Sequence, residues 1–220
     1  AFMELKNKKI AFLGDSITEG CAASSLENSF WGLVARDTGA ISYGYGIGGT
    51  RIAPQHTPSA EPAYDRYYAS RVDDMIPDAD IVVVFGGTND FGHGDAALGT
   101  PDDREEDTFC GALHALLEKL IMRYPYAQLV VLTPTHRADE EILDHGDTGA
   151  PRQAKLVEYV NAITEICGYY AVPVLDLFRT SGLQPRVPLL RELYNPDGLH
   201  PNDAGHRRIA DRLIGFLTAL

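Results

Sequence analysis

The stretch Ile10-Ala11-Phe12-Leu13-Gly14-Asp15-Ser16-Ile17-Thr18-Glu19-Gly20 decides the fold and points to the chemistry of this chain. It begins with four apolar residues, which is typical of a buried strand, and the pattern breaks at Gly14. A serine on a strand-to-helix turn projects its hydroxyl into the crevice beyond the carboxyl ends of a parallel sheet, beside helix N-terminal amides. Ser16 is therefore a candidate nucleophile. The alternative is that Ser16 only caps a turn, as Ser often does.

The rest of the chain alternates between strand-like and helix-like patterns. Strands are predicted at 40–45, 80–85, 128–133 and 172–177, and helices at 28–37, 61–75, 109–121, 156–170 and 209–220. The acidic segment 138–151 has no period and is expected to be a surface excursion. Five strands alternating with helices predict an α/β protein, a parallel sheet between two helix layers. Without a linker or repeat, residues 1–220 are expected to form one domain.

Composition excludes several classes of partner. The 19 basic and 31 acidic residues give a net charge of −12 with no cationic cluster, so no nucleic-acid partner is expected. No apolar run approaches the roughly 20 residues that a membrane span needs. Lys6, Lys8 and Lys9 are followed at once by the first strand, unlike a secretory signal, and with Met3 as the natural start a cytoplasmic location is expected.

Cysteine usage gives little sign of a disulfide framework or a zinc site. Cys21, Cys110 and Cys167 are far apart in the sequence and form no C-x-x-C pair. Cys110 and Cys167 fall on predicted helices among apolar neighbours, so we expect both in the core. Cys21 is a weaker candidate nucleophile than Ser16, because no histidine is placed for it by a motif.

A second polar turn lies just before the closing helix. In Asn195-Pro196-Asp197-Gly198-Leu199-His200-Pro201-Asn202, the Asp197 carboxylate and the His200 imidazole are three residues apart. On a tight turn the carboxylate can accept the Nδ1–H of the ring while Nε2 points toward a hydroxyl. A serine needs such a base, because its hydroxyl attacks only when its proton is removed. A plain turn with a helix cap remains the alternative.

Candidate oxyanion donors follow three different strands. They are the amide of Ser16, the amide of Gly49 in the glycine-rich segment 46–51, and the side-chain amide of Asn89. Such donors stabilise the charge that develops on the substrate oxygen in a tetrahedral intermediate. Asn89 could instead cap the segment that follows it.

Together these residues resemble a known family. Gly14-Asp15-Ser16, the glycine loop ending at Gly49, Gly87-Thr88-Asn89-Asp90 and Asp197-Gly198-Leu199-His200-Pro201 are similar, in order, to the four blocks of the SGNH or GDSL hydrolases. The resemblance implies a three-layer, flavodoxin-like α/β/α fold and a serine esterase without metal or cofactor. It implies Ser16 as nucleophile, His200 as base, Asp197 as its partner, and Ser16, Gly49 and Asn89 as the oxyanion hole.

One block departs from the family pattern. The family often has an asparagine before the glycine loop, where this chain has Tyr43-Gly44-Tyr45-Gly46, so Gly48 is an alternative donor to Gly49. The segment 195–202 most resembles bacterial members that deacylate small esters or acetylated sugars.

The predicted function is hydrolysis of a small carboxylic ester, with short acyl groups expected because no long apolar lid is present. Residues expected near the substrate are Asp15, Arg51, Phe91, His93 and His136, which follow strand ends. A thioesterase or lysophospholipase-type hydrolase and a non-catalytic glycan-binding module remain alternatives. Metal-assisted hydrolysis is a further alternative, with His93 and Asp95, or His136, Asp139, Asp144 and His145, as ligands.

Overall fold

Five apolar segments form a parallel sheet in the computed structural model, which describes residues 2–220. The strands are β1 (Lys9–Gly14), β2 (Ile41–Gly46), β3 (Ile81–Phe85), β4 (Gln128–Leu132) and β5 (Val174–Leu175), in the spatial order β2-β1-β3-β4-β5. Every neighbouring pair is parallel. The predicted five-stranded parallel α/β fold is confirmed, with β5 shorter than expected.

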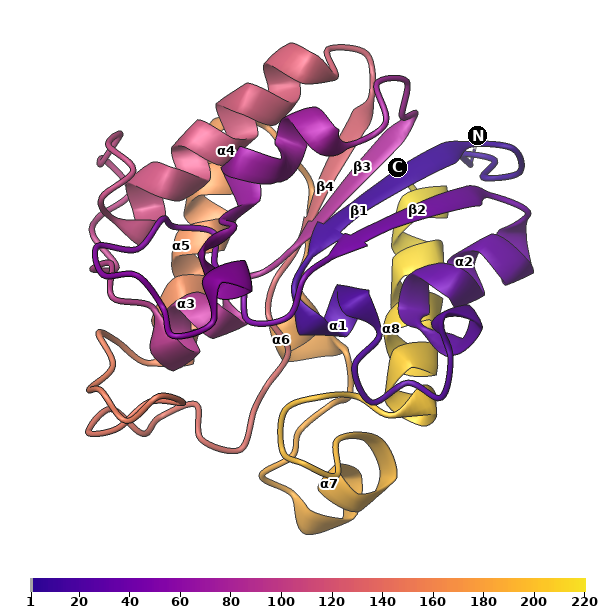
Figure 1. The fold of residues 1–220 in the computed structure, drawn as a ribbon. Helices are drawn as coiled ribbons and strands as arrows, with labels where there is room; N and C mark the ends of the chain where they lie inside the picture. The colour runs from indigo at the N-terminus through magenta and orange to yellow at the C-terminus, as the bar shows by residue number, and fades with distance from the viewer. Residues whose placement is uncertain (1) are drawn as a thin grey trace.

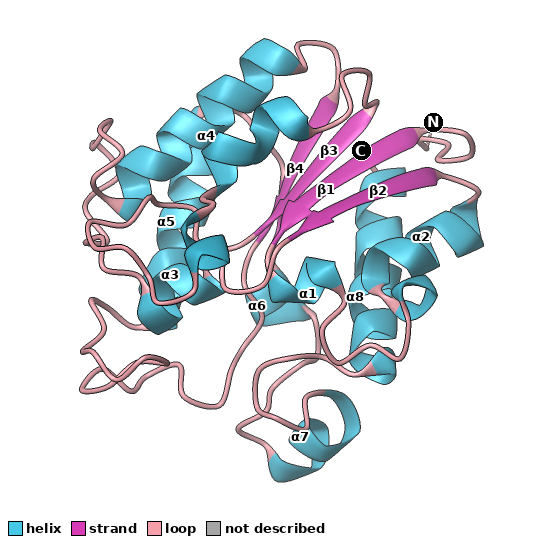
Figure 2. Ribbon diagram, in the orientation of Figure 1, coloured by secondary structure: helices cyan, strands magenta, loops and turns pink. Residues whose placement is uncertain are grey.

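Helices cover both faces of this sheet, as Figures 1 and 2 show. α4 (Phe109–Arg123) and α5 (Leu156–Tyr169) lie on one face, and α2 (Phe30–Thr38) and α8 (Asp203–Thr218) lie on the other. Alternate residues of the strands point to opposite faces, so β1 contributes Ala11 and Leu13 to one core and Ile10 and Phe12 to the other. Burial on both faces explains why the central strands are apolar at consecutive positions.

The predicted helix 61–75 is wrong. The structure has two 3₁₀ segments instead, η2 (Pro62–Asp65) and η3 (Tyr68–Asp74), separated by extended backbone at Tyr67. The segment is fixed by long side chains that reach the ends of the strands. Tyr68 donates its hydroxyl to the Phe85 carbonyl, and Arg71 donates to the Gly14 carbonyl. These tertiary bonds override the helical pattern, because backbone carbonyls at the end of a strand need partners.

Shorter helices stand at the carboxyl ends of the strands. α1 (Ser16–Glu19) follows β1, α3 (Thr88–His93) follows β3, and α6 (Leu177–Thr180) follows β5; η1 (Leu26–Asn28) and α7 (Pro188–Tyr194) lie in the connections. The loops after β1, β2 and β3 therefore meet at one rim, the usual ligand-binding edge of a parallel sheet. No helix within residues 2–220 is long and apolar enough to cross a membrane.

The acidic excursion after β4 is exposed at its tip but anchored at its base. Arg137 and Arg152 are buried and both bond to Asp139 and Asp147. Their guanidinium groups lie 5.1 and 4.3 Å from the centre of the Phe91 ring. These bonds hold Asp147, which together with Thr148 lines the pocket described below.

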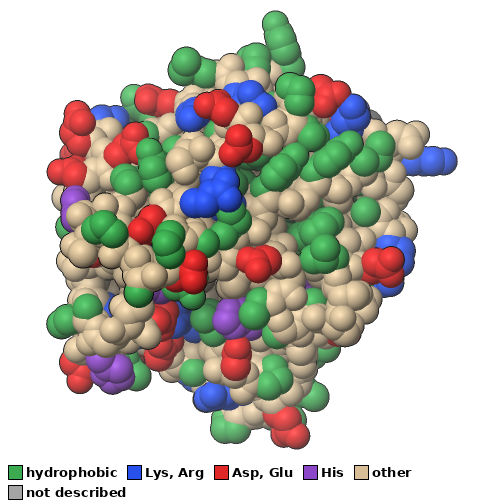
Figure 3. Space-filling model, viewed as in Figure 1, with side chains coloured by type: hydrophobic (Ala, Val, Ile, Leu, Met, Phe, Trp, Pro, Cys, Tyr) green, Lys and Arg blue, Asp and Glu red, His purple; other side chains and the backbone are tan. Residues whose placement is uncertain are grey.

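The surface is acidic, as the net charge of −12 predicts, and two of the three cysteines are buried. In Figure 3, acidic side chains are spread over the face in view among apolar and neutral ones. Cys110 and Cys167 are buried, which confirms their predicted place in the core, while Cys21 is exposed.

Candidate active site

Ser16 is held on a compressed turn between β1 and α1. Asp15 caps the helix by accepting the Ile17 amide at 3.0 Å, and Gly20 ends it in the left-handed conformation. Gly14 is required at the entry, because a Cβ atom there would lie 2.0 Å from the Thr18 hydroxyl. The turn presents the Ser16 side chain at the rim of the sheet.

The Ser16 hydroxyl meets an imidazole from the other end of the chain. Ser16 Oγ lies 2.9 Å from His200 Nε2, and His200 Nδ1 lies 2.6 Å from Asp197 Oδ2. The other oxygen of Asp197 accepts the amides of Leu199 and His200 at 2.8 and 2.7 Å. An ionised Asp197 accepts the Nδ1–H, so neutral His200 offers a bare Nε2 to the hydroxyl. The structure thus brings together the three residues of the predicted triad.

The charge of Asp197 suits this arrangement. Partial burial raises the pKa of Asp197, but hydrogen bonds from His200 and two amides outweigh it and hold the pKa below its ordinary value. The carboxylate therefore stays ionised at neutral pH and can stabilise a histidine that has taken up a proton.

Asp15 has a structural position, so its predicted contact with substrate is wrong. It is 2% exposed, and its side chain faces inward as the cap of α1. Burial raises its pKa to about 6, against the opposing effects of the Ile17 amide, His200 and Arg71. Asp15 thus supports the Ser16 turn from below.

The glycine loop lines the same pocket as Ser16. The Gly48 amide donates to the Glu19 carboxylate, whereas the Gly49 amide has no hydrogen-bond partner among the described residues. Gly49 adopts a φ of +76°, and a Cβ there would lie 2.3 Å from the Tyr64 ring. Of the two candidate glycines, Gly49 therefore has the available donor.

Asn89 and Asp90 hold the same loop from α3. Asn89 Nδ2 donates one hydrogen to the Thr50 carbonyl at 3.0 Å, which leaves its second hydrogen for a ligand. Asp90, 4% exposed, accepts the amides of Ile52 and Ala53 at 2.9 and 3.0 Å. Burial raises the pKa of Asp90 to about 6. The sequence motif contains Asp90, but its role in holding the loop was not predicted.

These groups line an open pocket of about 670 Å³. Its walls are Ser16, Glu19, Cys21, Ile47, Gly48, Gly49, Glu61, Ala63, Tyr64, Asn89, His93, Asp147, Thr148, Leu199 and His200. His93 was expected there, and Tyr64 and Asp147 were missed. Tyr64 lies in η2, where the sequence predicted a longer α-helix, and Asp147 lies in the excursion after β4, where the sequence has no period.

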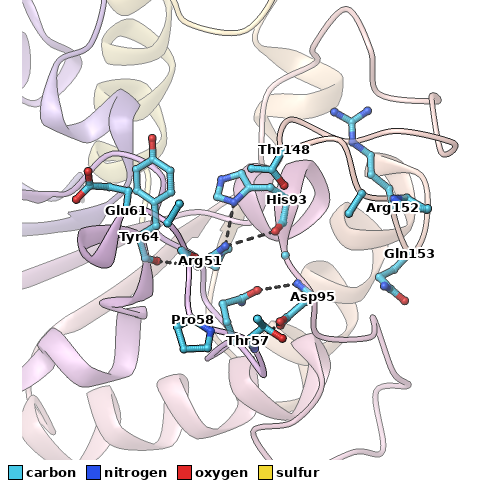
Figure 4. Close-up of a pocket in the computed structure, with 16 residues that line it drawn as sticks. Arg51, Thr57, Pro58, Glu61, Tyr64, His93, Asp95, Thr148, Arg152 and Gln153 are labelled. Carbon is cyan, nitrogen blue, oxygen red and sulfur yellow. Dashed lines mark hydrogen bonds between the residues drawn. The ribbon is translucent and has the colours of Figure 1, made fainter.

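Arg51 is not a wall residue of this pocket but bonds to the wall residue His93 from behind. It is 2% exposed, donates to His93 Nδ1 at 2.9 Å and pairs with Asp65 at 2.7 Å. It also forms part of the wall of an adjacent cavity of about 530 Å³, drawn in Figure 4 with Arg51 and His93 between Tyr64 and Arg152. The prediction that Arg51 lines the catalytic pocket is wrong, since its guanidinium is used to hold neighbouring segments.

Phe91 and His136 are also placed away from the substrate. The Phe91 ring is 1% exposed and packs edge-on against Tyr159 of α5 in the core. His136 packs on Phe178 and pairs with Glu140 at 2.8 Å, outside the walls of the catalytic pocket. Both predicted contacts with substrate are therefore wrong.

The alternative metal ligands do not converge. Asp139 is bonded to two arginines, and His145 pairs with its neighbour Asp144. Within residues 2–220, no three His, Cys, Asp or Glu side chains are arranged to hold a metal ion.

Comparison with known proteins identifies the family. Residues 12–208 match the model of the GDSL-like lipase/acylhydrolase family. A GDSL lipase of Mycobacterium tuberculosis is 26% identical over 224 residues, covering 98% of this chain and 84% of that protein. A solved structure from Lactobacillus plantarum is 33% identical, with a TM-score of 0.82 and coverage of 96% of this chain and 97% of the other.

A more distant structure shares the fold alone. It is an acetyl xylan esterase, 23% identical, with a TM-score of 0.60 over 95% of this chain and 99% of the other. The family model covers most of the chain and agrees with the serine, histidine and carboxylate brought together at the rim of the sheet. This chain belongs to the GDSL-like lipase/acylhydrolase family and is an ester hydrolase.

Proposed function

We propose that this protein removes short acyl groups, acetyl above all, from a carbohydrate or another small polar alcohol. The observation that supports it most is the hydrogen-bonded chain Ser16–His200–Asp197, open to a pocket that also contains the free Gly49 amide and Asn89.

In the proposed mechanism, Ser16 Oγ attacks the ester carbonyl as His200 Nε2 takes the hydroxyl proton. Negative charge moves to the carbonyl oxygen, which receives hydrogen bonds from Gly49, Asn89 and the Ser16 amide. His200, held by Asp197, then gives the proton to the leaving alcohol, and an acyl-enzyme remains on Ser16. Water activated by His200 releases the acid and restores the hydroxyl.

The surroundings of His200 favour a polar alcohol. The leaving oxygen must lie near His200 Nε2, from which it takes a proton. At this end the catalytic pocket adjoins a cavity of about 360 Å³ that has Arg137, Asp139 and Asp147 among its walls. Charged side chains hydrogen-bond hydroxyl groups well and pair poorly with hydrocarbon.

Charge disfavours anionic substrates. Glu19, Glu61 and Asp147 stand around the catalytic pocket, and the chain carries a net charge of −12. A phosphate-bearing thioester such as acetyl-coenzyme A would be repelled at this rim. A neutral acetylated sugar carries no such penalty, and the fold shared with an acetyl xylan esterase is compatible with that substrate.

A hydrolysis screen tests this function. The substrates are acetylated xylose and xylo-oligosaccharides, acetyl-coenzyme A, a lysophospholipid, and 4-nitrophenyl esters from acetate to decanoate. We expect the acetylated sugars and the shortest aryl esters to be hydrolysed fastest, with Ser16→Ala as the inactive control. Preference for the lysophospholipid, the thioester or the decanoate would overturn the substrate proposal, and no hydrolysis by the wild type would overturn the reaction.

A further inference from the structure

Two further cavities adjoin the catalytic pocket at different parts of its wall. The cavity of about 360 Å³ shares Asp147, Leu199 and His200 with the pocket, and the cavity of about 530 Å³ shares Glu61, Tyr64, His93 and Thr148. These two outer cavities have no wall residue in common. Because the leaving alcohol must lie at the His200 end, the acyl group of a bound ester points toward Tyr64 and His93.

Two rings stand where the acyl side of the pocket meets the larger outer cavity. The centres of the Tyr64 and His93 rings are 5.5 Å apart, and the rings are tilted by 42°. The Tyr64 ring packs directly on Gly49, where a Cβ would lie 2.3 Å from ring carbons. Tyr64 therefore stands beside the oxyanion donor and close to any acyl carbonyl held there.

One buried guanidinium fixes both sides of this ring pair. Arg51 Nη1 donates to His93 Nδ1 at 2.9 Å, and Arg51 Nη2 donates to the Tyr64 carbonyl at 3.1 Å. The same Nη2 also bonds Asp65 and Ser59 on the Tyr64 side. Figure 4 shows Arg51 between Tyr64 and His93, with dashed lines that mark its hydrogen bonds to each. Arg51 therefore holds the His93 ring directly and the backbone of Tyr64, so the two segments that carry the rings are fixed relative to each other.

The contact with Arg51 also sets the tautomer of His93. Arginine can only donate, so His93 Nδ1 accepts and the neutral ring carries its proton on Nε2. Burial, together with the charge of Arg51, lowers the pKa of His93 to about 4. The ring pair thus presents an uncharged imidazole with an N–H donor at neutral pH, a poor surface for a hydrocarbon chain to pass.

We propose that Tyr64 and His93, tied together by Arg51, form a gate that ends the acyl side of the pocket and limits the enzyme to short acyl groups. The cavity of about 530 Å³ beyond the gate, walled in part by Pro58, Ala60 and Pro151, is large enough for a medium-length chain once a ring is removed. This inference rests on the proposed function, because it takes the acyl-enzyme on Ser16 as given.

The test measures kcat/KM for 4-nitrophenyl acetate, butyrate, hexanoate and octanoate with the wild type, Tyr64→Ala and His93→Ala. Opening the gate should raise the ratio of hexanoate to acetate hydrolysis by at least about tenfold, the scale of discrimination by one or two methylenes. Tyr64→Phe, which keeps the ring, should keep the wild-type chain-length profile. Tyr126→Ala, at a wholly exposed tyrosine between α4 and β4, controls for unrelated effects.

A second readout separates the gate from a loss of catalysis. Alkyl phosphonofluoridates label a reactive serine, and their alkyl group takes the place of the acyl chain. The ratio of hexyl to ethyl labelling rates at Ser16 should rise in Tyr64→Ala and His93→Ala, even if Gly49 shifts and every rate falls. Unchanged ratios in both assays for both variants, with the wild type active on acetate, would overturn the gate and leave the proposed function standing. A wild type that neither hydrolyses esters nor labels at Ser16 would overturn both.

Discussion

Asp197 has two roles in the site: it orients the His200 ring, and it holds the backbone of the turn on which His200 lies. Its two oxygens accept three hydrogen bonds, one from the His200 ring and two from the amides of Leu199 and His200. The carboxylate therefore builds the turn that holds the histidine and also chooses its tautomer. Asp197 can accept all three bonds because His200 is only three residues further along the chain, so the tight turn brings both the backbone amides and the imidazole within reach of one carboxylate.

Replacement of Asp197 by asparagine should separate these two roles. The carboxamide of Asp197→Asn can still accept an amide, but its NH₂ group would face His200 Nδ1 and favour the tautomer whose Nε2 cannot take a proton. We expect kcat for an aryl acetate to fall by about 10³–10⁴-fold with little change in KM. Steady-state kinetics with a thermal melt check this, and a loss smaller than about tenfold in a folded variant would contradict the role.

At the scale of single residues, the sequence indicated side chains whose partners are fixed by local turns. Ser16, Asp197 and His200 each lie on a short motif whose geometry follows from its own residues. Phe91 and His136 also follow strand ends, yet they point into other parts of the molecule. Their direction depends on how the loops pack, which no local pattern encodes.

Among the elements, α3 does the most for the oxyanion site although it has only six residues. Asn89 and Asp90 bond three residues that follow Gly49, namely Thr50, Ile52 and Ala53. The position of the Gly49 amide thus depends on a short helix whose Asn89 is 39 residues beyond Thr50 in the chain. The family motif contains both residues, but only the structure shows that Asp90 faces the loop.

Asp90→Asn tests this dependence. The variant keeps one acceptor oxygen and sets an NH₂ group against a buried amide, so one amide of the loop loses its partner. We expect a loss of about 1–3 kcal/mol in unfolding free energy. We also expect kcat to fall by about tenfold or more, because the Gly49 donor is no longer held in place. Denaturant unfolding and steady-state kinetics measure the two effects; a destabilised variant with unchanged kcat would show that Asp90 serves stability alone.

The predicted helix at 61–75, which the structure replaces with two 3₁₀ segments, shows the limit of an apolar pattern. Its apolar spacing was real, since Tyr68 and Val72 are buried as a helix pattern requires. What the pattern could not show is that Tyr68 and Arg71 satisfy carbonyls at the ends of β3 and β1. Strands buried on both faces were easier to predict, because their apolar runs need no distant partner.

Over the whole molecule, the site requires that the N-terminal and C-terminal segments of the chain pack together. Ser16 follows the first strand, His200 precedes the last helix, and the Met3 amide donates to the Thr218 carbonyl at 2.9 Å. Figure 1 shows both termini at the same side of the sheet. The junction includes buried His206 on α8, whose Nδ1 accepts the Phe30 amide of α2 at 3.0 Å.

His206 should make the stability of the protein depend on pH. Burial lowers its pKa to about 4 in the folded state, against 6.5 for an ordinary histidine. Between these values the unfolded chain binds a proton and the folded chain does not. The contribution of uncharged His206 to the free energy of unfolding is therefore complete above pH 6.5. It is lost as the pH falls toward 4, and the total loss is up to about 3 kcal/mol.

His206→Gln isolates this effect, since glutamine can accept the Phe30 amide but does not titrate. Unfolding free energies measured at about pH 4.5, 5.5, 6.5 and 7.5 should show the wild type losing stability relative to the variant on acidification. Asp15 and Asp90, whose raised pKa values act in the opposite direction, are present in both proteins and cancel in the difference. Parallel stability curves would contradict the burial of an uncharged His206.

The most direct test of the account is the rate of 4-nitrophenyl acetate hydrolysis by Ser16→Ala. We predict that kcat/KM falls by at least about 10³-fold while the thermal melt stays that of the wild type. Ser70→Ala, at an exposed serine outside the pocket, should keep full activity. A folded Ser16→Ala enzyme with wild-type turnover would contradict the assignment of Ser16 as the nucleophile.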